Sequence, residues 1–248
     1  MGSSFFYLEF LMTWLSLLSA SGYNNPAIFA LEYTLAPDAS YPTQIGEALA
    51  GYDHVLKVAG DPSLVCVSGD SAGAMLVLSL LLHLTVDGPT QKTPAFAALI
   101  SPWVTLVSKR DITAKSDYLV MHQLRRYGSQ LAGSKIPTNH PLVSPGCCRD
   151  RLWWKRASPL KGIFISYGEN EVLAREIREL VDLLREANVI IESKGDPGGI
   201  HAWPVASLFL SSDDGKRLDG LRTMTQRIRE RIPTVFDGAV KKGDVSSD

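Results

Sequence analysis

The sequence predicts an α/β fold in which helices cover both faces of a mostly parallel sheet. Short apolar runs that suit strands alternate with longer segments that have helical spacing. One such run leads directly into a Gly-x-Ser-x-Gly pentapeptide, residues 69–73, and then into an apolar helical segment. The chain has 248 residues, enough to bury a sizeable core. We expect one domain over residues 1–240.

The first predicted element is a helix. Residues 5–18 are mostly apolar, but they are fewer than the roughly 20 that span a membrane. The run also contains Glu9 and lacks the basic start of a signal peptide. We therefore expect a buried helix of a globular domain, without a stable membrane span, and a signal peptide or membrane anchor is the alternative.

Strands and helices then alternate. Residues 26–33 predict a strand, and residues 43–58 predict a helix because apolar side chains recur there at spacings of three and four. A strand at residues 64–68 and a helix at residues 72–84 flank the serine pentapeptide. The apolar residues 96–100 predict the next strand.

The alternation breaks over residues 111–160, which are rich in proline and polar residues. We expect a lid-like insertion here, folded over the sheet edge. Residues 162–167 predict a strand, residues 171–187 a helix, and residues 189–193 a last strand, which a Gly-rich loop follows. One or two helices and a charged tail at residues 241–248, expected to be disordered, complete the chain.

The composition argues against several classes of protein. The 25 Lys and Arg and 26 Asp and Glu residues leave a net charge of −1, and no basic stripe with interleaved aromatic residues suggests nucleic-acid binding. The three cysteines are odd in number, with Cys147 and Cys148 adjacent, which favours free thiols in a reducing, cytoplasmic compartment. Neither Cys-x-x-Cys nor His-Glu-x-x-His spacing occurs, so we expect no metal site.

Ser71, at the centre of the pentapeptide, is the candidate nucleophile. A strand, a sharp turn and a helix in this order expose a serine hydroxyl at the end of a sheet. Glycines are expected at both flanks, Gly69 and Gly73, because a β-carbon there would clash in so sharp a bend.

A serine nucleophile requires a base within hydrogen-bond reach. Of the five histidines, His201 alone comes late in the chain, on the Gly-rich loop after a strand, and it is the candidate base. His54 and His83 are expected to be a surface and a core residue. His122 and His140 lie in the insertion, where they either line the substrate site or have no role in it.

The base in turn requires a carboxylate to orient it. The turn after the strand at residues 162–167 offers Glu169 and Glu171, and both are possible on chemistry alone. The alternative is that both are solvated glutamates at the start of a helix, where negative charge is favourable.

At this point several motifs resemble the hormone-sensitive-lipase-like family of α/β-hydrolases. The pentapeptide Gly-Asp-Ser-Ala-Gly matches the family's nucleophile turn, and residues 33–42 are similar to its Y-x-L-A-P-E…P segment. The similarity extends from about residue 2 to about residue 210. It implies an α/β-hydrolase fold and hydrolysis of carboxylic esters. Further similar motifs lie at residues 101–103, 158–160 and 199–203.

The resemblance also implies roles for single residues. The family's acid lies in a G-x-x-D-x-L turn, which corresponds here to residues 168–173 and implies Glu171, in place of the commoner Asp. The backbone N–H of Ala72 would bind the oxyanion. Asp70 and Trp103 are candidate substrate-binding residues, and for Asp70 the alternative is a structural role that anchors the turn.

In the family, a His-Gly-Gly-Gly loop supplies further oxyanion donors, and this chain starts a few residues after the position of that loop. Two interpretations are open: an internal methionine of a longer protein has been recorded as the start, or this is a genuine short form. Losing one oxyanion donor costs other enzymes about 10²–10³ in turnover. We also expect the strand at residues 26–33 to be an unpaired sheet edge.

We therefore expect a serine hydrolase that cleaves a small-molecule carboxylic ester with Ser71, Glu171 and His201 and requires no cofactor. The resemblance further implies a homodimer through the last strand and helix. One alternative is a natural-product tailoring hydrolase or acyltransferase that uses the same triad. Another is a catalytically impaired binding protein, although the gibberellin receptor, which resembles this family, has lost the histidine that His201 retains here.

Overall fold

A parallel sheet lies at the centre of the fold. The computed structural model describes residues 4–110, 114 and 116–234. Over this part of the chain the sheet has four strands, which lie side by side in chain order. These strands are β1 (Cys66–Asp70), β2 (Phe96–Ile100), β3 (Ile163–Gly168) and β4 (Ile191–Asp196).

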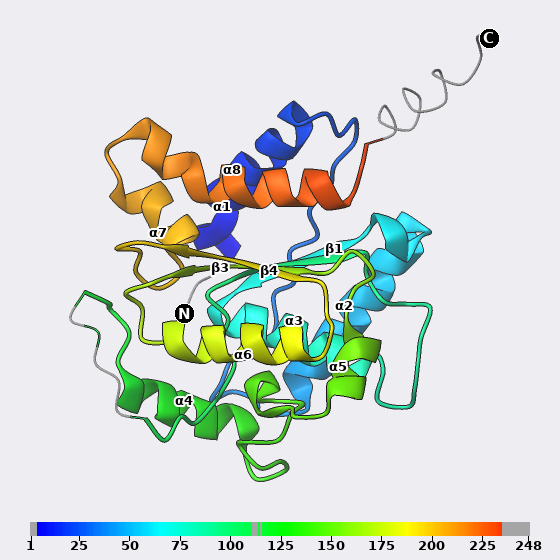
Figure 1. Cartoon of the computed structure of the whole chain (residues 1–248), viewed down its shortest axis with the longest axis vertical. Helices are drawn as coiled ribbons and strands as arrows, with labels where there is room; N and C mark the ends of the chain where they lie inside the picture. Colours follow the sequence, from blue (N-terminus) through cyan, green and yellow to red (C-terminus); the bar gives the residue numbers. More distant parts are fainter. Residues whose placement is uncertain (1–3, 111–113, 115, 235–248) are drawn as a thin grey trace.

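Helices cover both faces of this sheet, as the sequence predicts (Figure 1). One layer contains α1 (Ser4–Ala20), α7 (Trp203–Leu210) and α8 (Asp214–Arg231). On the opposite side lie α2 (Thr43–Ala59), α3 (Ser71–His83), α4 (Met121–Ala132), α5 (Arg151–Ala157) and α6 (Ala174–Glu186). Of these, α4 lies farther from the sheet than α6. Two short 3₁₀ turns, Pro62–Leu64 and Pro145–Cys147, connect elements of the chain.

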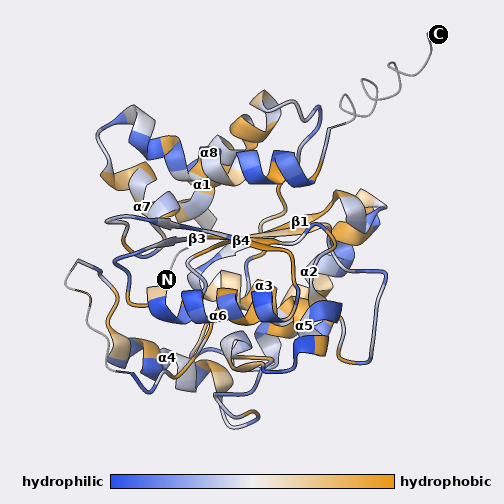
Figure 2. Ribbon diagram, viewed as in Figure 1, coloured by the Kyte–Doolittle hydropathy of each residue, from blue (hydrophilic) through white to orange (hydrophobic). Residues whose placement is uncertain are grey.

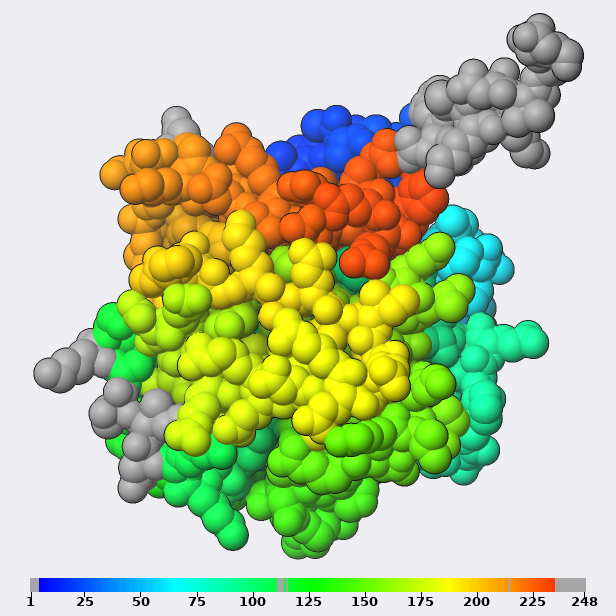
Figure 3. All heavy atoms as spheres, in the orientation of Figure 1, coloured from blue at the N-terminus to red at the C-terminus, as the bar shows by residue number. Residues whose placement is uncertain are grey.

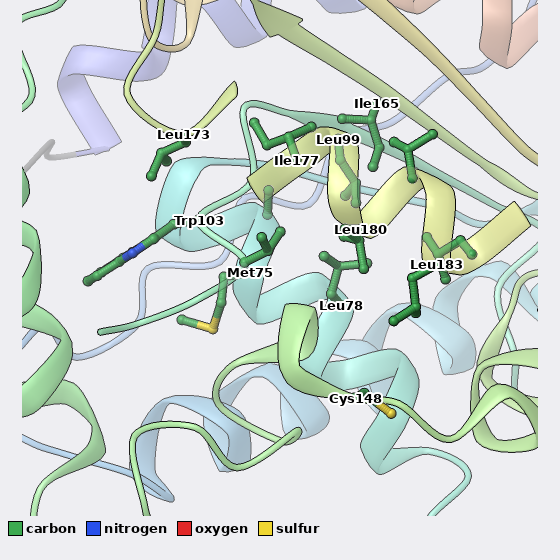
Figure 4. Close-up of a cluster of buried hydrophobic side chains, with 14 of the residues drawn as sticks. Met75, Leu78, Leu99, Trp103, Cys148, Ile165, Leu173, Ile177, Leu180 and Leu183 are labelled. Carbon is green, nitrogen blue, oxygen red and sulfur yellow. The ribbon is translucent and has the colours of Figure 1, made fainter. Parts of the chain in front are cut away.

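The two faces of the sheet bury separate cores because neighbouring strand residues point in opposite directions. In β3, Phe164 packs with Phe96 of β2 and with α1 and α8, whereas Ile165 packs against the opposite layer. Figure 4 shows the core between the sheet and the layer that contains α6, in which Leu99 and Ile165 lie beside Leu180 of α6. Both central strands are buried throughout, which explains their continuous apolar sequences.

The outer helices have the amphipathic pattern of elements that cover a sheet. Along α6, apolar residues that face the core alternate with charged residues that face solvent, visible as orange and blue segments in Figure 2. In the space-filling view of Figure 3, the yellow residues of α6 and β4 adjoin the orange and red residues of α7 and α8.

The prediction of a strand at residues 26–33 is wrong. The segment carries no strand hydrogen bonds, and β1 is the outer strand among the described residues. Phe29 and Leu31 instead approach Gly51 of α2, and Glu47 accepts hydrogen bonds from the backbone N–H and hydroxyl of Thr34. An apolar run becomes a strand only where a ladder partner is available, and here the segment packs on a helix instead.

Helix α1 forms where expected, but it is not fully buried. Phe10 and Trp14 pack into the core on one side, whereas Phe5, Leu8 and Met12 are more than half exposed. Within the described residues, no helix combines the length and the hydropathy needed to cross a membrane. The burial prediction fails because the apolar residues are spread around the helix and only one side meets the sheet.

The predicted insertion folds into α4, α5 and irregular segments, and only part of it lies at the carboxyl edge of the sheet. Its beginning reaches that edge, where the Tyr118 hydroxyl donates to the His201 carbonyl oxygen over 3.2 Å. Helix α4 packs closely on the segment after β2, since a β-carbon on Gly128 would lie 2.2 Å from the Leu106 carbonyl oxygen. Residues 111–113 and 115 and the charged tail at residues 241–248 lie outside the described residues.

Candidate active site

Each strand of the sheet delivers one polar side chain to the carboxyl edge. Ser71 follows β1 directly, Ser101 follows β2, Glu171 lies in the turn after β3, and His201 lies in the loop after β4. Because the strands are parallel, their carboxyl ends meet at the same edge of the sheet, where α/β proteins place their ligands. The topology therefore gathers four residues that are distant in sequence.

Ser71 lies on a strained turn between β1 and α3. Its φ of +52° is in the left-handed region, which is unusual for a residue with a side chain. The Ser71 carbonyl oxygen accepts a hydrogen bond of 3.1 Å from the Trp103 N–H, which fixes the serine backbone. Such strain at a half-buried serine agrees with the turn that the sequence predicts.

The two glycines of the turn are not equivalent. A β-carbon on Gly69 would lie 2.6 Å from the backbone carbonyl carbon of Gly73, closer than real contacts allow. A β-carbon on Gly73 would meet no described atom within 4 Å. The expectation of a clash at both flanks is therefore correct for Gly69 and wrong for Gly73, because a β-carbon on Gly73 would point into open space.

Glu171 and His201 face each other in the interior. The Glu171 Oε1 atom lies 3.7 Å from His201 Nδ1, and both side chains are almost completely buried. Each of these two atoms lacks a hydrogen-bond partner within the described part of the chain. Buried polar atoms strongly favour a partner, and catalytic hydrogen bonds are often long before substrate binds. A movement of less than 1 Å would join the pair.

The other oxygen of Glu171 is held firmly. The Ser101 hydroxyl donates to Oε2 over 2.6 Å, and the Gly168 N–H donates to the same atom over 3.0 Å. Ser101 Oγ also accepts a hydrogen bond of 3.0 Å from the Ala202 N–H, next to His201. Ser101 therefore connects the carboxylate with the histidine loop and leaves Oε1 free to face His201.

Ser101 is a site residue that sequence reasoning missed. It is fully buried and has a φ of +44°. In the sequence, Ser101 stands out only as part of a family motif at residues 101–103. Its position directly after the strand at residues 96–100 is the signal that could have identified it, because polar residues at strand ends collect at the same sheet edge.

The two candidate acids occupy different environments. Glu169 is exposed, and its side chain approaches Gly195 of β4. Glu171 is 4% exposed, so it is not a solvated glutamate of a helix start, and α6 begins only at Ala174. Of the two, Glu171 is the one that the structure brings to His201.

Asp70 is held by α1 and does not cap its own helix. The Tyr7 hydroxyl donates to Asp70 Oδ2 over 2.8 Å, and the carboxylate makes no capping hydrogen bond to α3. Burial raises the pKa of Asp70, and the Tyr7 hydrogen bond and the nearby His201 offset this only in part. Asp70 also helps burial to raise the pKa of Tyr33 to about 12. This environment agrees with a structural anchor of the serine turn.

Ala72 lies in the first turn of α3, where backbone N–H groups have no partner within the helix. It also lines a narrow apolar pocket of about 20 Å³ beside Met75 and Leu131. Trp103 is only 6% exposed and lies beside Met75 in the core, as Figure 4 shows. Its role in substrate binding stays a prediction.

Ser71 and His201 are not joined directly. No hydrogen bond between Ser71 Oγ and the His201 ring is found among the described residues. His201 is nonetheless close enough to the end of β1 for its charge to lower the pKa of Asp70. The Ser71–His201 contact of a working triad therefore stays a prediction.

The remaining histidines lie elsewhere. His54 is exposed on α2 against Phe29, and His83 at the end of α3 contacts the Ser79 carbonyl oxygen. His122 is exposed on α4, and His140 contacts the Leu142 N–H. The described residues hold no group of three or more His, Cys, Asp or Glu side chains suited to a metal ion.

Comparison with known proteins gives a consistent result. A family model described as the alpha/beta hydrolase fold matches residues 9–205. An acetyl-hydrolase from Streptomyces hygroscopicus is 30% identical over 181 residues, which cover 71% of this chain and 57% of the relative. The chain thus spans little more than half the length of this curated relative.

Solved structures show the same similarity. The hormone-sensitive-lipase homologue EstE7 from a metagenome library superimposes with a TM-score of 0.73 at 26% identity, covering 90% of this chain and 71% of EstE7. An esterase/lipase from an uncultured bacterium gives a TM-score of 0.71 at 25% identity, covering 88% of this chain and 69% of that structure.

The different spaces around the two glycines predict different effects of the same substitution. We expect Gly69→Ala to lower the free energy of unfolding by about 1–3 kcal/mol, because overpacking forces the backbone of α3 away from β1. Gly73→Ala should leave the free energy of unfolding unchanged or raise it by up to about 1 kcal/mol, because alanine is a better helix former than glycine. Urea unfolding of both variants tests this, and equal losses would contradict the geometry of the turn.

The raised pKa of Asp70 predicts a pH-dependent stability. Asp70 binds its proton more tightly in the folded protein than in the unfolded chain, where its pKa has the ordinary value of 3.8. The free energy of unfolding therefore falls as pH rises from 3.8 through the raised pKa of the folded state. The Asp70→Asn variant does not bury a negative charge at this position, and its amide oxygen still accepts the hydrogen bond from Tyr7. Urea unfolding should therefore show Asp70→Asn more stable than wild type at pH 7, with the gain vanishing near pH 3.

The exposed Asp182 of α6 offers a control for this experiment, because within the described part of the chain it pairs with Arg185 alone, at the surface. Asp182→Asn should change the stability little at either pH. If Asp70→Asn is less stable than wild type at pH 7, the hydrogen bond from Tyr7 outweighs the cost of burial.

Proposed function

The chain belongs to the alpha/beta hydrolase fold family, and from this premise we propose that it hydrolyses carboxylic esters with Ser71 as nucleophile, His201 as base and Glu171 as the residue that orients the base. The observation that carries this proposal is the buried pair of Glu171 and His201, 3.7 Å apart, at the same sheet edge as the strained Ser71. The similarity to an acetyl-hydrolase and to esterases supports it.

The proposed reaction begins when Ser71 Oγ attacks the acyl carbon and His201 Nε2 takes the hydroxyl proton. The Ala72 N–H stabilises the negative charge that develops on the carbonyl oxygen. The C–O bond to the alcohol then breaks, and His201 returns the proton to the departing oxygen. A water molecule next attacks the acyl carbon of the acyl-serine while His201 takes its proton. The bond from this carbon to Ser71 Oγ then breaks, and His201 returns the proton to Oγ, which releases the acid and restores Ser71.

Glu171 would hold the imidazole in the tautomer that leaves Nε2 free to accept the proton. Its Oε2 atom is already occupied by Ser101 and the Gly168 N–H. The carboxylate therefore cannot rotate without losing two hydrogen bonds, and Oε1 stays directed at His201 Nδ1. Placing the imidazolium that forms during attack beside this carboxylate lowers the barrier.

We propose a short acyl group as the preferred substrate. The pocket beside Ala72 is apolar and narrow, about 20 Å³, and Met75 and Leu131 bound it. A space of this size next to Ala72, the residue after Ser71, would hold a methyl group better than a long chain. The name of the Streptomyces relative, an acetyl-hydrolase, agrees with this size.

Location and assembly stay proposals as well. The three cysteines are free thiols, which agrees with a reducing cytoplasm. Strand β4 lies at an edge of the described sheet, where a homodimer through this strand and α8 would pair.

Substitution of the triad tests the proposed chemistry. With p-nitrophenyl acetate as substrate, Ser71→Ala should reduce kcat by about 10⁶-fold or to background, because no nucleophile remains. Glu171→Gln should reduce kcat by about 10⁴-fold, because the amide can stabilise the wrong tautomer of His201. Labelling with a fluorophosphonate should be lost in Ser71→Ala while the folded structure persists.

Glu169→Gln provides the matched control, since it changes an exposed carboxylate in the same turn. It should retain wild-type turnover. Loss of activity in Glu169→Gln together with an active Glu171→Gln would reassign the acid, and turnover that survives Ser71→Ala would refute the triad.

A series of p-nitrophenyl esters tests the proposed acyl preference. We expect kcat/KM to be highest for the acetate and to fall with chain length, because a misplaced methylene in a tight pocket is worth about 1–3 kcal/mol. Leu131→Ala should widen the pocket and improve the butyrate relative to the acetate. Tyr127→Ala, at an exposed position on α4, should not. A wild-type preference for octanoate would contradict a short acyl group.

A further inference from the structure

We propose that Asp117, in the insertion before α4, is a positioning residue that sets the Glu171–His201 geometry, an inference that rests on the proposed function. Its two carboxylate oxygens bind different catalytic segments. Oδ2 accepts a hydrogen bond of 2.8 Å from the Val172 N–H, next to Glu171. Oδ1 accepts a longer one of 3.4 Å from the His201 N–H. One side chain thus connects the acid turn to the histidine loop.

The neighbouring Tyr118 holds the same histidine from its other backbone group. Its hydroxyl donates to the His201 carbonyl oxygen over 3.2 Å, and its ring meets the imidazole edge-on with the centroids 5.9 Å apart. Asp117 takes the His201 N–H and Tyr118 approaches its C=O and its ring. The backbone and the ring of the histidine are therefore constrained together from the insertion.

Asp117 complements Ser101, which bridges the same two segments from the interior. Ser101 Oγ contacts Glu171 Oε2 and the Ala202 N–H and is fully buried. Asp117 contacts the residue after the acid and the histidine itself from the partly exposed side. Backbone hydrogen bonds, such as that of 3.1 Å from the Asn170 N–H to the Gly199 carbonyl oxygen, join the segments without reaching His201.

Asp117 contacts the acid turn and the histidine loop from a segment outside the sheet. The gap of 3.7 Å between Glu171 Oε1 and His201 Nδ1 is too long for a hydrogen bond. The segment that holds both partners belongs to the insertion, not to the sheet. Asp117 therefore makes the closure of this gap depend on the insertion.

The test compares Asp117→Ala, Asp117→Asn and Tyr118→Phe with wild type and with Asp182→Ala, which removes an exposed carboxylate of α6. Two quantities are measured on the intact chain. One is kcat and KM for p-nitrophenyl acetate, per enzyme that a fluorophosphonate labels. The other is the low-field ring N–H proton of His201 in the NMR spectrum, which reports its hydrogen bond to Glu171 and is assigned with a His201→Gln variant.

We expect Asp117→Ala to lower kcat by about 10- to 100-fold, because a misplacement of about 1 Å costs up to about 10²-fold. KM should change less than kcat, and the low-field proton signal should weaken or disappear. Asp117→Asn retains one acceptor oxygen and should give an intermediate loss. Tyr118→Phe should lose less than Asp117→Ala, and Asp182→Ala should match wild type.

A purely structural role for Asp117 would lower the melting temperature but leave the kcat of the labelled fraction and the proton signal unchanged, and this result overturns the inference. If Asp117→Ala does not fold, Asp117→Asn decides in the same way. If the wild type is active and its Asp117 variants retain full kcat, the positioning role is refuted and the proposed function stays intact.

If the wild type shows neither turnover nor label, the proposed function is refuted. The proton signal then decides on Asp117: its loss in Asp117→Ala supports the positioning role, and its persistence, or its absence from wild type, refutes it.

Discussion

The burial of the Glu171 carboxylate is the constraint on which the arrangement of the candidate site depends. A charged group removed from water is costly unless partners satisfy it. Among the residues that the structure describes, three groups approach it, each from a different place: the Ser101 hydroxyl after β2, the Gly168 N–H at the end of β3, and His201 after β4. The contacts with Ser101 and Gly168 are hydrogen bonds. The distance from Glu171 Oε1 to His201 Nδ1 exceeds hydrogen-bond distance by less than 1 Å.

The parallel sheet makes this arrangement possible. Its strands point in one direction, so each loop that follows a strand emerges at the same edge. The apolar cores on the two faces of the sheet hold the strands in register, and the site residues need no long loops to meet. The strain in Ser71 and Ser101, both with positive φ, is maintained by this rigid scaffold.

The sequence predicts a feature correctly where the signal is local and incorrectly where the feature depends on a partner distant in the chain. The turn at Ser71 was predictable because a strand, glycines and a helix specify it within a few residues. The segment at residues 26–33 has the apolar composition of a strand, but it packs on α2, since a strand also requires a neighbour with free hydrogen-bonding groups. The apolar helix α1 is buried on one side only, for a similar reason.

The sequence by itself determined the alternation of strands and helices, the serine turn and the candidates Ser71 and His201, because periodicity and motifs are properties of neighbouring residues. For the acid, chemistry left Glu169 and Glu171 open, and the family resemblance implied Glu171. The tertiary structure places Glu171, and not Glu169, beside His201, and it alone decided that Ser101 and Asp117 connect their two loops. These contacts join residues that are 30 to more than 80 positions apart. Their existence depends on strand order, burial and the direction of each side chain, which no local pattern in the chain encodes.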